Sequence, residues 1–335
     1  MSTAPAPFRN DPSRGWSPSA ALLVALGGVV TSTASHADEG GVSFWAPGLY
    51  GSLAAVPGEA GWSWATVYNH TSVDGGGGRT FLRGGRFESG LSARVDGVFF
   101  GPTYTFETPF LGAQAALSLT GIAGRSEASV DATLTGPRGN TISGERSDAR
   151  TAFGDLYPQF TLKWNQGVHN FLAYGTGGIP VGAYNPNRLA NLGTGHAAID
   201  GGGGYTYFDP KSELEFSAVL GFTYNFENPD TEYRNGIDMH LDWGASYFIN
   251  ERLHVGAVGY LYNQITGDSG EGARLGDFKS RVAGVGPQIG YMFRIGERIN
   301  AYLNVKAYGE FAAQNRPEGW NAWVTLSFSL AQPGR

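Results

Sequence analysis

Long stretches of the chain alternate between apolar residues and polar or small ones, which is the pattern of a β-strand with two unlike faces. The clearest example covers residues 237–247. Its polar or small face carries Asp238, His240, Asp242, Gly244 and Ser246. Its apolar face carries Ile237, Met239, Leu241, Trp243, Ala245 and Tyr247. A soluble sandwich would bury the apolar face, whereas a membrane barrel would turn it toward lipid.

The same alternation recurs along most of the chain and predicts twelve strands. They cover residues 62–71, 91–100, 112–124, 153–164, 170–181, 199–208, 214–224, 238–247, 253–264, 281–293, 301–311 and 322–330. Most of them have the length of a tilted membrane strand, roughly 9 to 11 residues, and are longer than the five or six residues that are typical of soluble strands.

The connections between these strands alternate in length. Tight turns are expected at residues 165–169, 209–212, 250–252 and 294–298, and longer loops at 73–89, 125–150, 182–198, 227–235, 266–279 and 312–319. Short turns at one end and long loops at the other are typical of outer-membrane barrels. Aromatic residues near strand ends, such as Trp62, Trp164 and Trp320, are expected to form girdles at the lipid interfaces. The predicted fold is all-β: a transmembrane, antiparallel, up-and-down β-barrel of about twelve strands.

Composition and charge support this fold and exclude other classes. Glycine accounts for 52 of 335 residues, and charged residues for only 16%, against about 25% in ordinary soluble proteins. The sequence has no cysteine, so no disulfide holds the fold together. The net charge of −6 is unsuited to a nucleic-acid partner, which would favour a basic surface.

The first residues predict export. Arg9 and Arg14 precede an apolar run at 20–30, and small residues at positions 35 and 37 suit signal cleavage after Ala37. The run is shorter than the roughly 20 residues of a membrane helix, which makes a retained anchor the weaker interpretation. We therefore expect residues 1–37 to be a cleaved signal peptide and the protein to reside in a bacterial outer membrane.

The rest of the chain divides into three parts. Residues 38–61 do not alternate cleanly but are too apolar for a disordered leader. They are expected to form a periplasmic segment or a plug in the barrel lumen, with Phe44, Trp45, Leu49 and Tyr50 as the plug residues. Residues 62–330 form the barrel, and residues 331–335 form a polar tail.

Polar side chains on the inward faces of the strands are the candidate site residues. They are Arg94, Asp96, Asp155, Gln159, Lys163, Glu215, Asp238, His240, Asp242, Tyr260, Tyr262, Gln264, Gln288, Lys306, Tyr308 and Glu310. Two interpretations are open: these groups pair with one another and hold the plug, or they line a permeation path.

Other chemistries find less support. A hydrolase using Asp238, His240 and Asp242 is an alternative, but neighbours at i and i+2 on a strand are separated by nearly 7 Å, and no Gly-x-Ser-x-Gly elbow is near. The glycine runs 75–78, expected in a loop, and 201–204, expected in a strand, lack the lysine of a phosphate loop. Acidic residues at 268, 271 and 277 lack the spacing of a Ca²⁺ loop. No catalytic residue, metal or cofactor is expected, and a structural barrel with a closed lumen is a further alternative.

Several segments carry a resemblance to a known family. They are FWAPGLYG at 44–51, GDLYPQ at 154–159, YRNGIDMHLD at 233–242, GAVGYLYNQITGD at 256–268 and VGPQI at 285–289. They resemble the outer-membrane family named after the meta-pathway of phenol degradation. The resemblance implies a barrel that serves as a channel or transporter for small aromatic or hydrophobic solutes. Outer-membrane lipid, lipopolysaccharide and the barrel-assembly machinery are the expected partners of such a barrel. One departure is the C-terminus, where Ser329 and Leu330 follow Phe328 instead of a terminal aromatic residue.

Overall fold

The computed structural model describes residues 43–80, 86–273 and 279–330. The predicted signal peptide at 1–37, residues 38–42 and the polar tail at 331–335 lie outside the described residues. No helix in the described part of the chain is long and apolar enough to cross a membrane.

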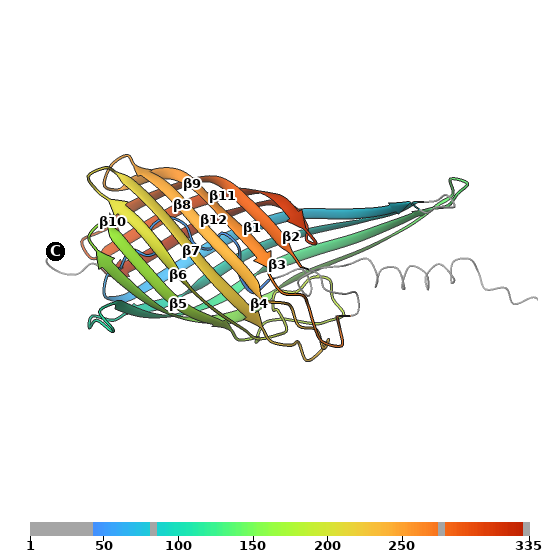
Figure 1. Cartoon of the computed structure of the whole chain (residues 1–335), viewed down its shortest axis with the longest axis horizontal. Helices are drawn as coiled ribbons and strands as arrows, with labels where there is room; N and C mark the ends of the chain where they lie inside the picture. Colours follow the sequence, from blue (N-terminus) through green and yellow to red (C-terminus); the bar gives the residue numbers. More distant parts are fainter. Residues whose placement is uncertain (1–42, 81–85, 274–278, 331–335) are drawn as a thin grey trace, which may run out of the picture. The chain divides into compact units, whose positions relative to one another are not determined.

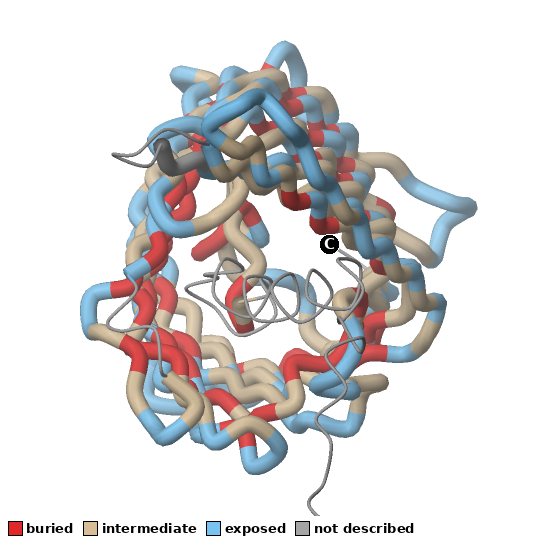
Figure 2. The backbone as a smooth tube through the Cα atoms, turned by 90° about the vertical axis from the view of Figure 1, so that its right-hand side faces the viewer, coloured by how far each residue is buried: buried red, intermediate tan, exposed pale blue. Residues whose placement is uncertain are grey.

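The structure is a closed antiparallel barrel of twelve strands (Figure 1). The strands are β1 (Gly61–Thr80), β2 (Arg86–Thr105), β3 (Gln114–Thr135), β4 (Thr141–Gln166), β5 (His169–Gly178), β6 (Ala198–Asp209), β7 (Leu214–Asn225), β8 (Asp238–Phe248), β9 (Leu253–Gln264), β10 (Arg281–Ile295), β11 (Ile299–Gln314) and β12 (Glu318–Leu330). Each strand pairs with the next, and the pair Ser63 and Ser329 lies in the register of β1 with β12 that closes the ring (Figure 2). The predicted fold class and strand order are confirmed.

The two faces of the barrel wall differ as the alternation predicts, and β7 shows this most clearly. The side chains of Phe216, Leu220 and Phe222 are exposed on the outside, whereas Glu215 and Ser217 are buried on the inside. The apolar outer face suits lipid, because every backbone polar group of a closed barrel is paired within the wall.

The barrel has two unlike ends. The turn end carries the connections 106–113, 167–168, 210–213, 249–252 and 296–298. The loop end carries the longer connections 179–197 and 226–237 and, between β9 and β10, residues 265–273 and 279–280. Both the start of β1 and the end of β12 lie at the turn end, because an even number of strands returns the chain to the side from which it started.

Three of the predicted long loops are instead largely strand. β1 to β4 are 20 to 26 residues long and take up most of 73–89 and 125–150, including Gly75, Gly76 and Gly77, while β11 and β12 take up most of 312–319. Past the last pairing of β1 with β12, residues 75–80, 86–91, 130–135 and 141–146 form a sheet of four strands at the loop end (Figure 1). We call it the projecting sheet. One of its faces carries Phe87, Leu134 and Ile142 in register, whereas the other, which continues the outer face of the barrel, is small or polar. The apolar outer face that marks a lipid-facing strand is therefore missing, although the backbone still pairs.

A lipid-facing charge should destabilise the barrel. Leu220 lies midway along β7 with 42% of its surface exposed on the outer face, and Leu220→Arg should lower the free energy of unfolding by about 2–4 kcal/mol. Urea unfolding in lipid vesicles measures the change. The control, Ser143→Arg on the outer face of the projecting sheet, should unfold like the wild type; equal losses for both variants would contradict the assignment of the membrane region.

Candidate functional site

Residues 43–60, which we call the inner segment, lie inside the barrel and run from the loop end toward the turn end. The Trp45 ring stacks on His240 near the start of β8, and the Ser52 hydroxyl lies 2.9 Å from that of Ser246 near its end. Glu59 then accepts a hydrogen bond of 2.7 Å from the Asn300 amide at the start of β11. The inner segment therefore descends along β8 before the chain turns into β1.

A charged pair holds the middle of the inner segment. The Asp242 carboxylate on β8 accepts hydrogen bonds from the backbone N–H of Gly48, at 2.9 Å, and of Tyr50, at 3.1 Å. The Lys306 ammonium on β11 donates to three successive carbonyls, those of Gly48, Leu49 and Tyr50, at 2.6, 3.0 and 3.2 Å. Asp242 and Lys306 are both buried, and their opposite charges flank the same turn of the inner segment.

Side chains on β6 and β7 hold the next part of the inner segment. The backbone N–H of Leu53 donates to Glu215 at 2.9 Å, and that of Ala55 donates to the Thr206 hydroxyl at 3.0 Å. On β10, the Gln288 amide donates to the Ser52 hydroxyl at 2.6 Å. β6 to β11 thus bind one whole side of the inner segment, and we call them the anchoring wall.

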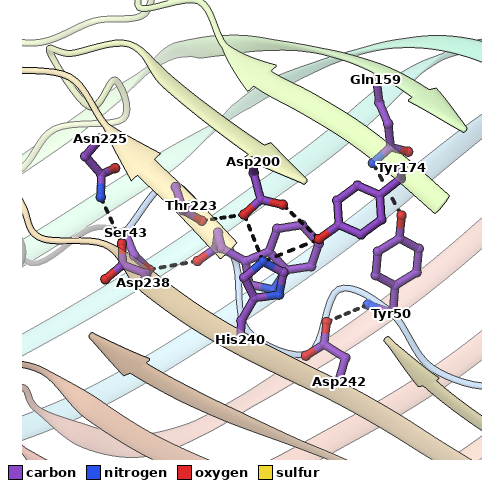
Figure 3. A network of polar contacts seen from close by, with 11 residues as sticks. Ser43, Tyr50, Gln159, Tyr174, Asp200, Thr223, Asn225, Asp238, His240 and Asp242 are labelled. Atoms are coloured by element: carbon purple, nitrogen blue, oxygen red, sulfur yellow. Dashed lines mark hydrogen bonds and ion pairs between the residues drawn. The ribbon is translucent and has the colours of Figure 1, made fainter. Parts of the chain in front are cut away.

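The Trp45 ring is seated on a buried polar cluster of His240, Asp200, Tyr174 and Thr223. Figure 3 shows the side chains of these four residues. His240 Nε2 lies 2.8 Å from Asp200 Oδ2, and the Tyr174 hydroxyl donates to Asp200 Oδ1 at 2.8 Å. The Thr223 hydroxyl also donates to Asp200. The indole of Trp45 covers the imidazole, with ring centroids 3.7 Å apart and planes at 13°. The cluster therefore fixes the start of the inner segment by stacking.

Two glycines make room for this cluster. A Cβ on Gly221 of β7 would lie 2.0 Å from the Tyr174 hydroxyl and 2.5 Å from His240 Cε1. A Cβ on Gly202 of β6 would lie 2.9 Å from Tyr174 Cε1. The glycine run 201–204 lies in a strand, as predicted, and Gly202 allows the close approach of the β7 backbone as well as of Tyr174.

The opposite wall, made of β1 to β5, makes fewer hydrogen bonds to the inner segment, and we call it the cavity wall. A cavity of about 270 Å³ lies between the two. Its lining is mainly apolar and aromatic: Phe44, Trp45, Ala46, Leu49, Tyr50, Ala65, Val67, Phe99, Phe100, Gly101, Thr120, Tyr157, Gln159 and Thr176. All four residues predicted as plug residues are among them.

A second cavity, of about 610 Å³, lies at the turn end and is polar. Residues 57–60 of the inner segment line it together with side chains that include Gln114, Lys163, Asn165 and Arg294. We call the first space the apolar cavity and the second the polar vestibule.

The remaining predicted site residues bind loops or one another. Asp155 accepts hydrogen bonds from the backbone N–H of Gly182 and Thr194, both at 2.8 Å, and so holds the loop between β5 and β6. At the loop end, Gln264 donates to Asp268 at 2.6 Å, Asn225 donates to Asp238 at 2.9 Å, and the Arg316 guanidinium lies 5.0 Å from the Tyr262 ring. The Tyr260 hydroxyl donates to Glu310 at 2.7 Å, and that of Tyr308 donates to the Gly48 carbonyl at 3.2 Å.

Arg94 and Asp96 are not in the lumen, and the structure corrects this prediction. Asp96 accepts a hydrogen bond of 2.6 Å from the hydroxyl of Tyr68, which is 40% exposed on the outer face. Arg94 lies two residues away on the same face of β2. Both lie next to the projecting sheet, where the outer face is no longer apolar, so polarity does not distinguish inward from outward positions there.

The constellation of the alternative hydrolase interpretation does not assemble. The carboxylate beside His240 is Asp200, two strands away, whereas Asp242 binds the inner segment. His240 is 1% exposed and covered by Trp45, so neither water nor substrate reaches its ring. Among the described residues, no three His, Cys, Asp or Glu side chains are grouped to hold a metal ion.

Sequence reasoning missed several residues of the site. Asp200, Tyr174 and Thr206 were not predicted, although the alternation around the outward Ile199 places Asp200 on the inner face. The sequence does not show that Asp200 contacts His240, because this contact depends on the strand register, which brings the two residues together across the glycines of β6 and β7.

The fold and interior define a class of protein. Twelve strands closed into a barrel, apolar outside and polar inside, are characteristic of outer-membrane β-barrels. Two solved structures are similar to the structure of this chain. An outer membrane channel from Pseudomonas putida F1 is 12% identical, with 84% of this chain and 98% of that chain covered and a TM-score of 0.54. A Pseudomonas aeruginosa FadL homologue is 9% identical, with 90% and 96% covered and a TM-score of 0.39.

The sequence itself places the chain in a family. Residues 70–326 match the family described as "Putative MetA-pathway of phenol degradation", and the chain belongs to this family. The resemblance seen in the sequence is thereby confirmed. No curated protein matches the sequence.

The glycine that admits the polar cluster should resist substitution. Gly221→Ala would press a methyl group into Tyr174 and His240 and should lower the free energy of unfolding by about 1–3 kcal/mol. The matched control is Gly201→Ala, whose Cβ would lie 3.5 Å from its nearest neighbour and should cost much less. Urea unfolding compares the two variants. Equal free energies of unfolding would mean that the cluster rearranges around the added methyl group at little cost.

Proposed function

We propose that the protein is a passive channel or transporter for small aromatic or hydrophobic solutes across the outer membrane, and not an enzyme. The observation that carries this proposal is the apolar cavity, which lies inside a polar barrel beside the inner segment. Five aromatic side chains of the inner segment and the cavity wall face it: Phe44, Trp45, Tyr50, Phe99 and Tyr157. Aromatic rings favour planar apolar solutes by stacking and edge contacts.

The family name and the fold of the Pseudomonas putida channel support the same function. We further propose that the inner segment is a partial plug, and that the predicted lumen residues serve mainly as its anchors. In support, Asp242, Lys306, Glu215 and Lys163 all bind backbone atoms of the inner segment. The solute would then pass along the cavity wall rather than along the stripe of Asp238, His240 and Asp242.

The apolar outer face supports outer-membrane lipid as a partner, and we propose lipopolysaccharide and the barrel-assembly machinery on the same basis. The closed structural barrel is the alternative that an experiment must exclude. The purified full-length protein in planar lipid bilayers should give discrete current steps in KCl, which benzyl alcohol should reduce by entering the apolar cavity.

Filling the cavity should block this current. Thr120 lines the apolar cavity, and Thr120→Trp should lower the current several-fold and remove its sensitivity to benzyl alcohol. The control is the neighbouring Leu119→Trp, which places the same ring on the outer face, where Leu119 is 45% exposed. No current from the wild type would favour the closed structural barrel, and unchanged current in Thr120→Trp would place the path elsewhere.

The plug should stay in place while solute passes. Because the sequence has no cysteine and the hydroxyls of Ser52 and Ser246 are 2.9 Å apart, the double variant Ser52→Cys, Ser246→Cys should form a disulfide between inner segment and anchoring wall. We expect the same current before and after oxidation. A current that falls on oxidation and returns with reductant would show that the inner segment must leave its seat.

A further inference from the structure

The apolar cavity and the polar vestibule are neighbours along β4. Gln159 lines the first and Lys163 lines the second, and both point inward from the same strand. Four residues of a strand span about 13 Å, so the two spaces are separated by a short stretch of wall. A solute moving through the barrel along the cavity wall must pass this stretch.

Two hydrogen bonds cross the lumen at this stretch. The Gln159 amide donates to the Tyr50 hydroxyl at 3.3 Å, and the Lys163 ammonium donates to the Val56 carbonyl at 3.1 Å. Below them, the Gln114 side chain exchanges two hydrogen bonds of 2.8 Å with the backbone of Gly58. In Figure 3 the Gln159 side chain reaches down to the Tyr50 hydroxyl, while the Tyr50 backbone is held by Asp242 on the other side.

The two sides of the inner segment are held very unequally. Asp242 and Lys306 alone make five hydrogen bonds to residues 48–50 from the anchoring wall. Between the apolar cavity and the polar vestibule, Gln159 and Lys163 make one each from the cavity wall. Breaking these two bonds would join the cavities, whereas release from the anchoring wall would leave buried charges without partners.

Resting on the channel function proposed above, we infer that Gln159 and Lys163 form a gate between the apolar cavity and the polar vestibule, and that the gate selects ring solutes bearing a hydrogen-bond acceptor. Both side chains are donors, to a hydroxyl oxygen and to a carbonyl oxygen. A solute with a carboxylate, hydroxyl or carbonyl group replaces the acceptor that each donor loses on opening. A plain hydrocarbon leaves the Lys163 ammonium without one, which is costly away from water.

Currents through the full-length protein in planar bilayers test the gate. Gln159→Ala and Lys163→Met, made separately, should each raise the open probability in KCl about fivefold, the scale set by loss of one hydrogen bond. In gradients of potassium benzoate against potassium chloride, the wild type should favour benzoate, and Lys163→Met should lower the benzoate to chloride permeability ratio about tenfold, because it removes a charged donor.

The matched control is Gln288→Ala, which removes a glutamine that binds the inner segment from the anchoring wall. It should leave both the open probability and the permeability ratio unchanged, and the heat-dependent gel shift of a folded barrel shows that each variant is folded. If the wild type conducts but Gln159→Ala and Lys163→Met behave like Gln288→Ala, the proposed gate is contradicted and the proposed channel function is retained. If all three variants open alike, the inner segment loosens as a whole and the gate is again wrong. If neither wild type nor any variant conducts, the channel function fails first.

Discussion

The structure depends on how the backbone N–H and carbonyl groups of the inner segment find hydrogen-bond partners inside a membrane barrel. The segment has no strand partner, yet buried N–H and carbonyl groups need partners. Asp242 and Lys306 supply them for residues 48–50, one accepting from the N–H groups and the other donating to the carbonyls. The two charges compensate each other on either side of one turn, so neither is buried alone. A neutral pair would satisfy fewer groups, because only an ammonium offers three donors from one atom.

This solution determines where a solute can go. The polar side chains of the anchoring wall bind the inner segment. The stripe of Asp238, His240 and Asp242, which the sequence marks as a possible pore lining, is therefore covered by the chain itself. The free space remains on the opposite side, where Ala65, Val67 and Thr120 offer small or apolar surfaces. A polar interior and an apolar cavity thus coexist in one barrel.

The sequence predicts the strands well because the period of two is imposed by lipid on one face and by the interior on the other. It fails where one of these conditions ends. Around Arg94 and Asp96 the wall nears the projecting sheet, and polarity no longer distinguishes inside from outside. Asp200 and Tyr174 were missed for a different reason: their contact with His240 depends on strand register and on Gly202 and Gly221, which are visible only when the strands are paired.

The inner segment is also continuous with β1, and this makes its docking an intramolecular step. Glu59, which accepts a hydrogen bond from Asn300, lies only two residues before the start of β1 at Gly61, so the effective concentration of the segment at the anchoring wall is high. Local opening in proteins follows the least stable contacts first. Asp242 and Lys306 hold the segment from the anchoring wall by five hydrogen bonds, whereas Gln159 and Lys163 each make a single one from the cavity wall. The proposed gate therefore opens at the cavity wall while the segment stays docked.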